Sequence, residues 1–272
     1  MPVGVLAFIL GLIQALTEFL PVSSSAHLIL ARTWLDFKAA DGLTFDVALH
    51  FGTLVAIVIY FRRDLLALLR GFVNSIFRRG LKDPNGRMAW FVIAACVPGA
   101  VVGARYETAI ETYFRHPGVT VFTLIAGALL FLWAEKRFIH EALMHSLSLE
   151  RALIIGCAQT FALIPGVSRS GITIVVGMMC GLRRDEAARF SFLLATPITF
   201  GACLLKGLEL SESNLPIPHD EKVALIVGVL TSAVGGWMVI RFLLGFLRRH
   251  GLQVFAWYRI ALALAVAAFL LF

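Results

Sequence analysis

The stretch "ALIIGCAQTFALIPGVSRSGITIVVGMMCGL", residues 152–182, decides the fold because it is almost wholly apolar and yet contains an arginine. Arg169, flanked by Ser168 and Ser170, is its only formal charge. One membrane-spanning helix needs about 20 apolar residues, so this stretch is too long for one span and too short for two. Pro165 also breaks it. We expect a re-entrant helical hairpin, because broken backbone is tolerated at membrane depth only where protein or a cavity surrounds it.

The rest of the chain has the composition of an integral membrane protein. Of 272 residues, 59% are hydrophobic and 15% are charged, whereas soluble domains carry about 25% charged residues. Further apolar segments fall near 2–31, 43–61, 88–104, 117–134, 190–205, 223–240 and 252–272. The first contains a proline break and is predicted as a second re-entrant hairpin. The prediction is one all-α membrane domain over residues 1–272, a polytopic helical bundle with six spanning helices and two re-entrant hairpins.

The loops between these segments carry very different numbers of basic residues. On the predicted path, the loops on one face hold 16 Lys and Arg, and the loops on the other face hold six. Because basic loops stay in the cytoplasm, both termini are expected on the extracytoplasmic side. The net charge of +7 then reflects membrane topology. It does not indicate nucleic-acid binding, since no basic run is interleaved with aromatic residues on a polar surface.

The two broken segments resemble each other at a shift of 145 residues. "ILGLIQALTEFLPVSSS" (9–25) then faces "IIGCAQTFALIPGVSRS" (154–170), with six identities that include Gln14 with Gln159 and Ser23 with Ser168. Each half of the chain, about 1–134 and 152–272, has a hairpin followed by three spans. The halves start from opposite sides of the membrane. This pattern favours an inverted repeat, with a site where the two hairpins meet near the midplane.

Each hairpin carries a single formal charge, Glu18 in the first and Arg169 in the second. A charge at the bilayer centre costs about 2.5 to 3.5 kcal/mol on insertion scales, so such residues usually face a partner or a cavity. The two opposite charges are therefore expected to be neighbours. A buried structural ion pair is one interpretation. A functional site is the other.

The serines that follow each proline favour the functional interpretation. They are Ser23, Ser24 and Ser25 in the first hairpin and Ser168 and Ser170 in the second. Serines at helix starts cap free backbone N–H groups, and helix N-termini attract anions. Capping alone would explain the serines but not Arg169, whose planar fork suits phosphate. With no nucleotide-binding motif in the chain, the sequence predicts a site for a lipid phosphate or diphosphate.

Hydrolysis at such a site needs a nucleophile, a proton carrier and neutralisation of the anion. Ser24 or Ser23 is the candidate nucleophile, and His27 is the candidate acid or base. Glu18, with Gln14 one turn earlier, is placed to hold a divalent cation that bridges diphosphate oxygens. Alternatively, Glu18 is itself the base.

Other polar residues receive no role from the sequence. His50 and the remaining histidines are interpreted as lying in or beside loops, without metal-ligand spacing. Arg259, near the start of the last span, is expected to snorkel to the interface or to approach the lipid head group. Asp46 is expected near an interface, and the four cysteines are expected to be packing residues.

Two motifs resemble those of a known family. "QALTEFLPVSSSAH" (14–27) and "PGVSRSGIT" (165–173) are similar to the [E/Q]xxxE and PGxSRSxxT signatures of the bacterial undecaprenyl-pyrophosphate phosphatases of the bacitracin-resistance (BacA) type. The resemblance covers essentially the whole chain, including "FSFLLATPI" (190–198) and "YR" (258–259).

The resemblance implies a multi-pass homodimeric hydrolase of the bacterial cytoplasmic (inner) membrane. Its reaction would convert undecaprenyl diphosphate and water to undecaprenyl phosphate and phosphate on the extracytoplasmic side. This recycles a lipid carrier for peptidoglycan and other envelope polymers and confers bacitracin resistance. A divalent cation, Mg²⁺ or Ca²⁺, is implied as cofactor.

The family motifs also assign roles by position. Glu18 matches the essential glutamate, Ser24 the proposed nucleophile and His27 the nearby histidine. The phosphate-binding set is Ser168, Arg169, Ser170 and Thr173, together with Ser23 and Ser25 of the first motif. Gln14 stands where some members have a first glutamate, which weakens any metal site built on two carboxylates.

Two other classes of function remain open from the sequence. A transporter or flippase of a polyprenyl phosphate would use the same inverted repeat and broken helices without a nucleophile. A structural membrane scaffold would leave the polar cost of the hairpins unexplained.

Overall fold

The protein is described here by a computed structural model, which covers residues 1–35, 42–114, 116–138, 141–212 and 218–271. Nearly all of these residues are helical, and within these ranges the only bridge between extended segments joins Ala142 and Leu182. The prediction of an all-α fold is confirmed.

The helices follow the predicted apolar segments, except for the helix at 62–74. They are α1 (Val3–Phe19), α2 (Ser24–Leu35), α3 (Gly42–Tyr60), α4 (Arg62–Asn74), α5 (Pro84–Phe114), α6 (Pro117–Arg137), α7 (Leu149–Gln159), α8 (Arg169–Met179), α9 (Arg184–Glu212), α10 (His219–Leu247) and α11 (Gln253–Leu271).

Both broken segments form a helix, a break and a second helix. In the first, α1 ends at Phe19 and α2 begins at Ser24. In the second, α7 is followed by the single turn η4 (Thr160–Leu163), and α8 begins at Arg169. Proline lacks an N–H group and disfavours helix at the residue before it, so Pro21 and Pro165 account for the interruptions. The predicted breaks are confirmed.

Several of the remaining helices are long and apolar enough to cross a membrane. In the described part of the chain these are Pro84–Tyr106 of α5, α6, Arg184–Glu209 of α9 and α10. A fifth crossing is added if α3 and α4, bent by 80° at their junction, are taken together. The segment 62–87, which lies between two predicted apolar segments, is largely helical because α4 is amphipathic and packs against α5.

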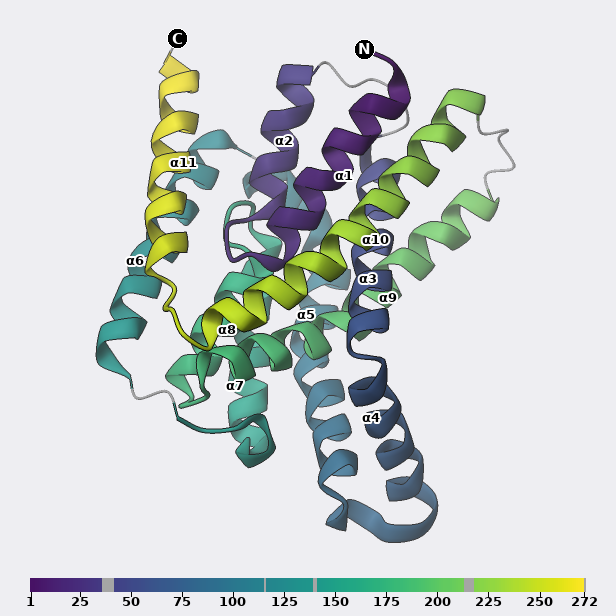
Figure 1. The fold of residues 1–272 in the computed structure, drawn as a ribbon, viewed down its shortest axis with the longest axis vertical. Helices are drawn as coiled ribbons and strands as arrows, with labels where there is room; N and C mark the ends of the chain where they lie inside the picture. Colours follow the sequence, from purple (N-terminus) through teal and green to yellow (C-terminus); the bar gives the residue numbers. More distant parts are fainter. Residues whose placement is uncertain (36–41, 115, 139–140, 213–217, 272) are drawn as a thin grey trace.

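The breaks lie inside the bundle, with the outer helices around them. Figure 1 shows both termini and α2 at one end of the molecule and the connection between α4 and α5 at the other. Helix α1 packs along α10, α7 packs against α5, and α11 packs against α6. The two helical pairs that carry the breaks are therefore each held against a long helix.

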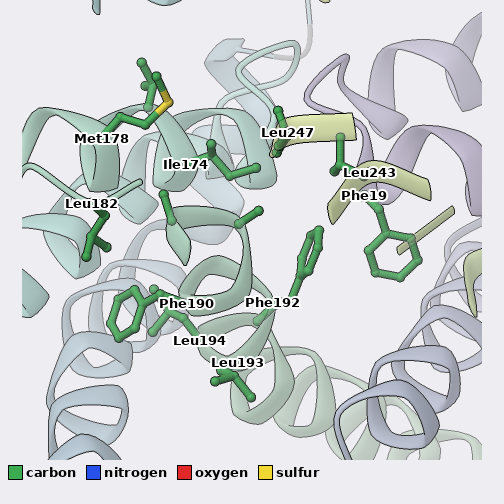
Figure 2. Close-up of a cluster of buried hydrophobic side chains, with 14 of the residues drawn as sticks. Phe19, Ile174, Met178, Leu182, Phe190, Phe192, Leu193, Leu194, Leu243 and Leu247 are labelled. Atoms are coloured by element: carbon green, nitrogen blue, oxygen red, sulfur yellow. The ribbon is translucent and has the colours of Figure 1, made fainter. Parts of the chain in front are cut away.

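The hydrophobic core fixes the segments on either side of the breaks. Figure 2 shows Phe19, Ile174, Phe192 and Leu243, which come from α1, α8, α9 and α10. The rings of Phe19 and Phe192 meet edge to face with centroids 5.4 Å apart. Because Phe19 follows Glu18 directly, this packing positions the carboxylate.

Candidate active site

The two breaks meet, and they bring together the charges predicted to be neighbours. Nη2 of Arg169 lies 2.5 Å from Oε1 of Glu18, and both side chains are mostly buried. Nη1 of Arg169 donates to Oγ1 of Thr199 on α9 at 2.7 Å. The guanidinium therefore bridges α1 and α9 from the start of α8.

The two breaks share an unusual backbone geometry. Ser23 has φ 75° and Ser168 has φ 71°, in the left-handed region that side chains other than glycine rarely adopt. Each of these serines bonds to the serine two residues later. Oγ of Ser23 lies 3.2 Å from Oγ of Ser25, and Oγ of Ser168 lies 3.2 Å from Oγ of Ser170. Strained backbone of this kind persists only where the surroundings enforce it, and it concentrates at functional sites.

Close packing on α6 helps to enforce the second break. Gly166 has φ 89°, and a Cβ atom there would lie only 2.9 Å from the carbonyl oxygen of Thr120. Oγ1 of Thr123 donates to the carbonyl of Pro165 at 2.7 Å. Oγ of Ser168 then caps α8 by accepting from the N–H of Gly171.

Glu18 is the centre of the polar network. Besides Arg169 on Oε1, its Oε2 accepts from Oγ of Ser24 at 2.8 Å and from Nε2 of Gln14 at 3.1 Å. Nε2 of His50 lies 3.4 Å from the same oxygen. Four side chains, from α1, α2, α3 and α8, therefore converge on one carboxylate.

This network opens into a cavity of about 230 Å³. Its lining combines polar side chains from the two breaks, α1, α3 and α7 with apolar residues from α5, η4 and α9. The polar lining residues are Glu18, Ser23, Ser24, Ser25, His50, Gln159, Ser168 and Arg169, and the others are Gly99, Ala162, Leu163 and Ile198. A cavity lined by both charged and apolar residues fits an amphiphilic anion.

The interpretation of His50 as a residue in or beside a loop is wrong. It lies within α3, and its Nδ1 donates to the carbonyl of Asp46 one turn earlier at 2.8 Å. Its Nε2 therefore faces Glu18. The signal was present in the sequence, since a histidine inside the apolar segment 43–61 is a polar group at membrane depth.

His27 occupies a different place from the one its spacing suggested. Its Nδ1 donates to the carbonyl of Ser23 at 2.7 Å, and its Nε2 lies 2.7 Å from the hydroxyl of Tyr258 on α11. The ring stacks on Tyr258 and is not among the residues that line the cavity. The structure thus brings His50 rather than His27 to Glu18.

The other predicted phosphate-binding residues divide into two groups. Ser23, Ser25 and Ser168 line the cavity. Ser170 donates to the carbonyl of Leu20, which links the second break to the first. Thr173 is buried between the carbonyl of Arg169 and the hydroxyl of Ser191, at 2.7 and 2.6 Å.

Arg259 neither snorkels nor approaches a head group, so both expectations for it are wrong. Its side chain is fully buried, with 0% exposed. Its five N–H groups donate to five backbone carbonyls, those of Pro21, Thr123, Leu124, Gly166 and Val167. It joins both breaks to α6 from α11.

The residues around Glu18 do not fit a divalent cation held by protein ligands alone. Both oxygens of Glu18 face N–H or O–H donors, and Gln14 presents its amide nitrogen, which cannot ligate a cation. In the described part of the chain, no three His, Cys, Asp or Glu side chains gather as a metal site. Among the described residues that line the cavity, one has a carboxylate, Glu18.

The fold and the cavity define a helical integral membrane protein with a polar cavity at the meeting point of two broken helices. The profile described as "Bacitracin resistance protein BacA" matches residues 7–265 of this sequence. The chain belongs to the BacA family.

Curated relatives match along nearly the whole chain. A protein of Rubrobacter xylanophilus is 49% identical over 268 residues, which cover 97% of each chain. A protein of Moorella thermoacetica is 46% identical, with 96% of each chain covered, and one of Geotalea daltonii is 43% identical, with 98% covered. All three are named undecaprenyl-diphosphatase.

Proposed function

We propose that this protein is an undecaprenyl-diphosphatase, which hydrolyses the lipid diphosphate to undecaprenyl phosphate and inorganic phosphate. The observation that carries the proposal is the hydroxyl of Ser24, 2.8 Å from a Glu18 carboxylate that is itself paired with Arg169. A hydroxyl that donates to a carboxylate, beside a guanidinium that can take phosphate oxygens, is an arrangement for phosphoryl transfer. The names of the relatives agree with this reaction.

The geometry supports Ser24 as the nucleophile. Its oxygen would bond to the terminal phosphorus as the bridging P–O bond breaks and undecaprenyl phosphate leaves. The proton of Ser24 would pass to Glu18, to which it already donates. Water would then attack the phosphoserine, release inorganic phosphate and restore the serine. Arg169 and the N–H groups at the starts of α2 and α8 would stabilise charge on the phosphoryl oxygens.

The divalent cation stays a prediction. The residues of the cavity do not themselves form a cage for Mg²⁺ or Ca²⁺, and we derive no step through one. Mg²⁺ usually keeps several waters and is bound by one or two carboxylates together with substrate phosphates. A cation would therefore enter the site bound to the diphosphate, and Glu18 is the one carboxylate among the described residues that line the cavity.

We extend the proposal to the arrangement in the membrane. Six spans and two re-entrant hairpins would form an inverted repeat of about 1–134 and 152–272. The shared geometry of the breaks supports the repeat, as does the packing of α1 on α10 and of α7 on α5. The charge pattern supports a cytoplasmic-membrane protein with both termini and the site opening outside, and a homodimer remains part of the proposal.

The proposed activity is tested by phosphate release from a polyprenyl diphosphate by the purified protein in detergent. Wild type should release phosphate. Arg169→Lys should reduce kcat/KM by about 10²-fold or more, because an ammonium cannot replace the guanidinium fork between Glu18 and phosphate. Each protein is assayed with and without a chelator, and loss of activity on chelation would place a cation in the reaction.

Near-normal turnover of Arg169→Lys would contradict the role given to the guanidinium. If well-folded wild type releases no phosphate, the proposed function is contradicted, and a lipid-flipping assay would then test the flippase alternative. Arg249→Lys, at an exposed position after α10, is the matched control and should behave as wild type.

His50 is expected to act as a hydrogen-bond donor to Glu18. Because Nδ1 donates to a carbonyl, Nε2 faces the carboxylate and can donate when the ring is protonated. His50→Gln retains an N–H donor and should lose less than about 10-fold in kcat/KM. His50→Leu leaves the carboxylate without this donor and should lose about 10²-fold.

The two variants are compared by steady-state kinetics beside His250→Leu. Nδ1 of His250 lies 3.3 Å from the carbonyl of Phe246, four residues earlier, as Nδ1 of His50 does from that of Asp46, but His250 is exposed and lies just after α10. Equal losses in His50→Gln and His50→Leu would show that the imidazole itself, rather than its donor, is required.

A further inference from the structure

Gln159, the last residue of α7, has a buried side chain without a hydrogen-bond partner in the described part of the chain. It is 4% exposed, and neither Nε2 nor Oε1 has a partner there. It also lines the cavity. Buried amide groups are nearly always hydrogen-bonded, because an unpaired one loses its bonds to water without replacement. A group left in this state at a cavity wall points to a ligand that completes it.

The comparison with Gln14 explains why this amide is free. At the 145-residue shift Gln14 corresponds to Gln159, and Glu18 corresponds to Leu163. Gln14 donates its amide to Glu18. Gln159 has an apolar residue at the equivalent position, so its amide is left for something that enters the cavity.

The surroundings of Gln159 indicate which part of a lipid diphosphate would reach it. Gly99, Leu163 and Ile198 form the apolar side of the cavity beside it. A Cβ atom at Gly99 would lie 3.3 Å from Nε2 of Gln159 and 3.4 Å from Cδ1 of Ile198, so the glycine leaves the amide room. Ser24 and Glu18 line the same cavity from α2 and α1, where the hydroxyl of Ser24 donates to the carboxylate. The prenyl chain is expected on the apolar side, which brings the phosphate that bears it toward Gln159.

We propose that Gln159 binds the lipid-bearing phosphate of the substrate by donating its amide N–H to a non-bridging oxygen. The inference rests on the proposed function, because it assigns one phosphate to the side of Gln159 and the terminal phosphate to the side of Ser24. That phosphate is the leaving group. The amide therefore stabilises the negative charge that it gains as the P–O bond breaks. Gln159 is a binding residue for the product undecaprenyl phosphate as well as for the substrate.

The test measures equilibrium binding of two anions to purified wild type, Gln159→Leu and Gln159→Glu. The anions are a polyprenyl monophosphate and inorganic phosphate, and the method is titration calorimetry in detergent. For the polyprenyl monophosphate, Kd should rise 3- to 10-fold in Gln159→Leu, the range for one neutral hydrogen bond, and more in Gln159→Glu, whose carboxylate repels phosphate. For inorganic phosphate, which needs only the Ser24 side, Gln159→Leu should leave Kd unchanged.

A thermal unfolding measurement separates this role from a structural one. Leucine has a similar size and no polar atoms, so Gln159→Leu should be at least as stable as wild type without ligand. Lower stability in both Gln159→Leu and Gln159→Met would mean that the amide has a structural partner and would overturn the inference. Gln253→Leu, at an exposed position at the start of α11, is the control and should change neither Kd.

The binding measurement also keeps this inference separate from the proposed activity. Unchanged Kd for polyprenyl monophosphate in Gln159→Leu would overturn the inference even if wild type hydrolyses the diphosphate. Equal weakening for both anions would overturn the assignment of the amide to the lipid-bearing phosphate. A third outcome is that Gln159→Leu binds only the polyprenyl phosphate more weakly, while wild type releases no phosphate. This would contradict the proposed hydrolase activity and would still support the contact between Gln159 and the lipid-bearing phosphate.

Discussion

Glu18→Gln is expected to lower kcat/KM for polyprenyl diphosphate by about 10³-fold or more while the protein still folds and inserts. Removal of a general base costs about 10² to 10⁴ in rate, and Glu18 has more than this one role. It accepts from Ser24 and Gln14, pairs with Arg169 and faces His50. A glutamine would turn an N–H group toward one of these donors and would remove the negative charge between two basic side chains.

The loss is measured by phosphate release in steady-state and single-turnover assays, with thermal unfolding to confirm the folded state. Glu141→Gln, at an exposed position between α6 and α7, is the matched control and should retain wild-type activity. If Glu18→Gln keeps more than about a tenth of wild-type kcat/KM, neither proton transfer to Glu18 nor its positioning of Ser24 can be part of the reaction.

The location of the site was predictable because its residues are out of place in an apolar chain. Glu18 and Arg169 are single charges in long apolar segments, and Pro21 and Pro165 mark where helix cannot continue. These signals are local, so they can be read from the sequence alone. Their convergence was inferred from opposite charge, and the ion pair between Glu18 and Arg169 confirms it.

The partners of these residues were harder to predict. His50 and His27 are both polar residues in apolar surroundings, but only a three-dimensional structure shows that α3 turns one toward Glu18 and that α11 supplies Tyr258 to the other. Sequence spacing favoured His27 because it is near Ser24 along the chain. The unpaired amide of Gln159 could not be predicted from the sequence either, since only the structure shows that no described neighbour offers it a hydrogen bond.

Arg259 is the residue whose role the sequence could least reveal. Its acceptors are backbone carbonyls, which have no signature in a sequence, and they lie in the first break, the second break and α6. A charged residue near the end of a span is ordinarily expected to snorkel. Here the guanidinium instead forms hydrogen bonds to three segments that are far apart in the sequence.

Replacement of Arg259 is expected to disrupt both breaks together. The carbonyls of Pro21, Gly166 and Val167 lie outside helices, and Arg259 donates to each at 3.0 to 3.4 Å. A buried carbonyl without a donor costs about 1 to 3 kcal/mol, so Arg259→Met should cost roughly 3 to 9 kcal/mol. Folded proteins are stable by about 5 to 15 kcal/mol, and this variant should therefore express poorly or unfold.

Arg259→Lys is the variant that tests function rather than folding. An ammonium has three donors in place of five, so at least two carbonyls lose their bond, and the cation over the ring of Phe131 changes shape. The breaks should then drift relative to each other. A misplacement of about 1 Å at reacting groups can cost about 10²-fold, which is the expected fall in kcat. Thermal unfolding should show a lower Tm in the same protein.

The control for Arg259→Lys is Arg241→Lys, which keeps a cation near the ring of Trp237 on the outside of α10 and should change neither kcat nor Tm. A loss of kcat in Arg259→Lys, with wild-type Kd for inorganic phosphate, would mean that the anion site survives and the nucleophile has moved. A fall in kcat together with weaker binding of inorganic phosphate would mean that Arg259 maintains the whole site. Wild-type kcat and Tm would show that the two breaks hold their positions without it, through the pair of Glu18 with Arg169 and the core around Phe19 alone.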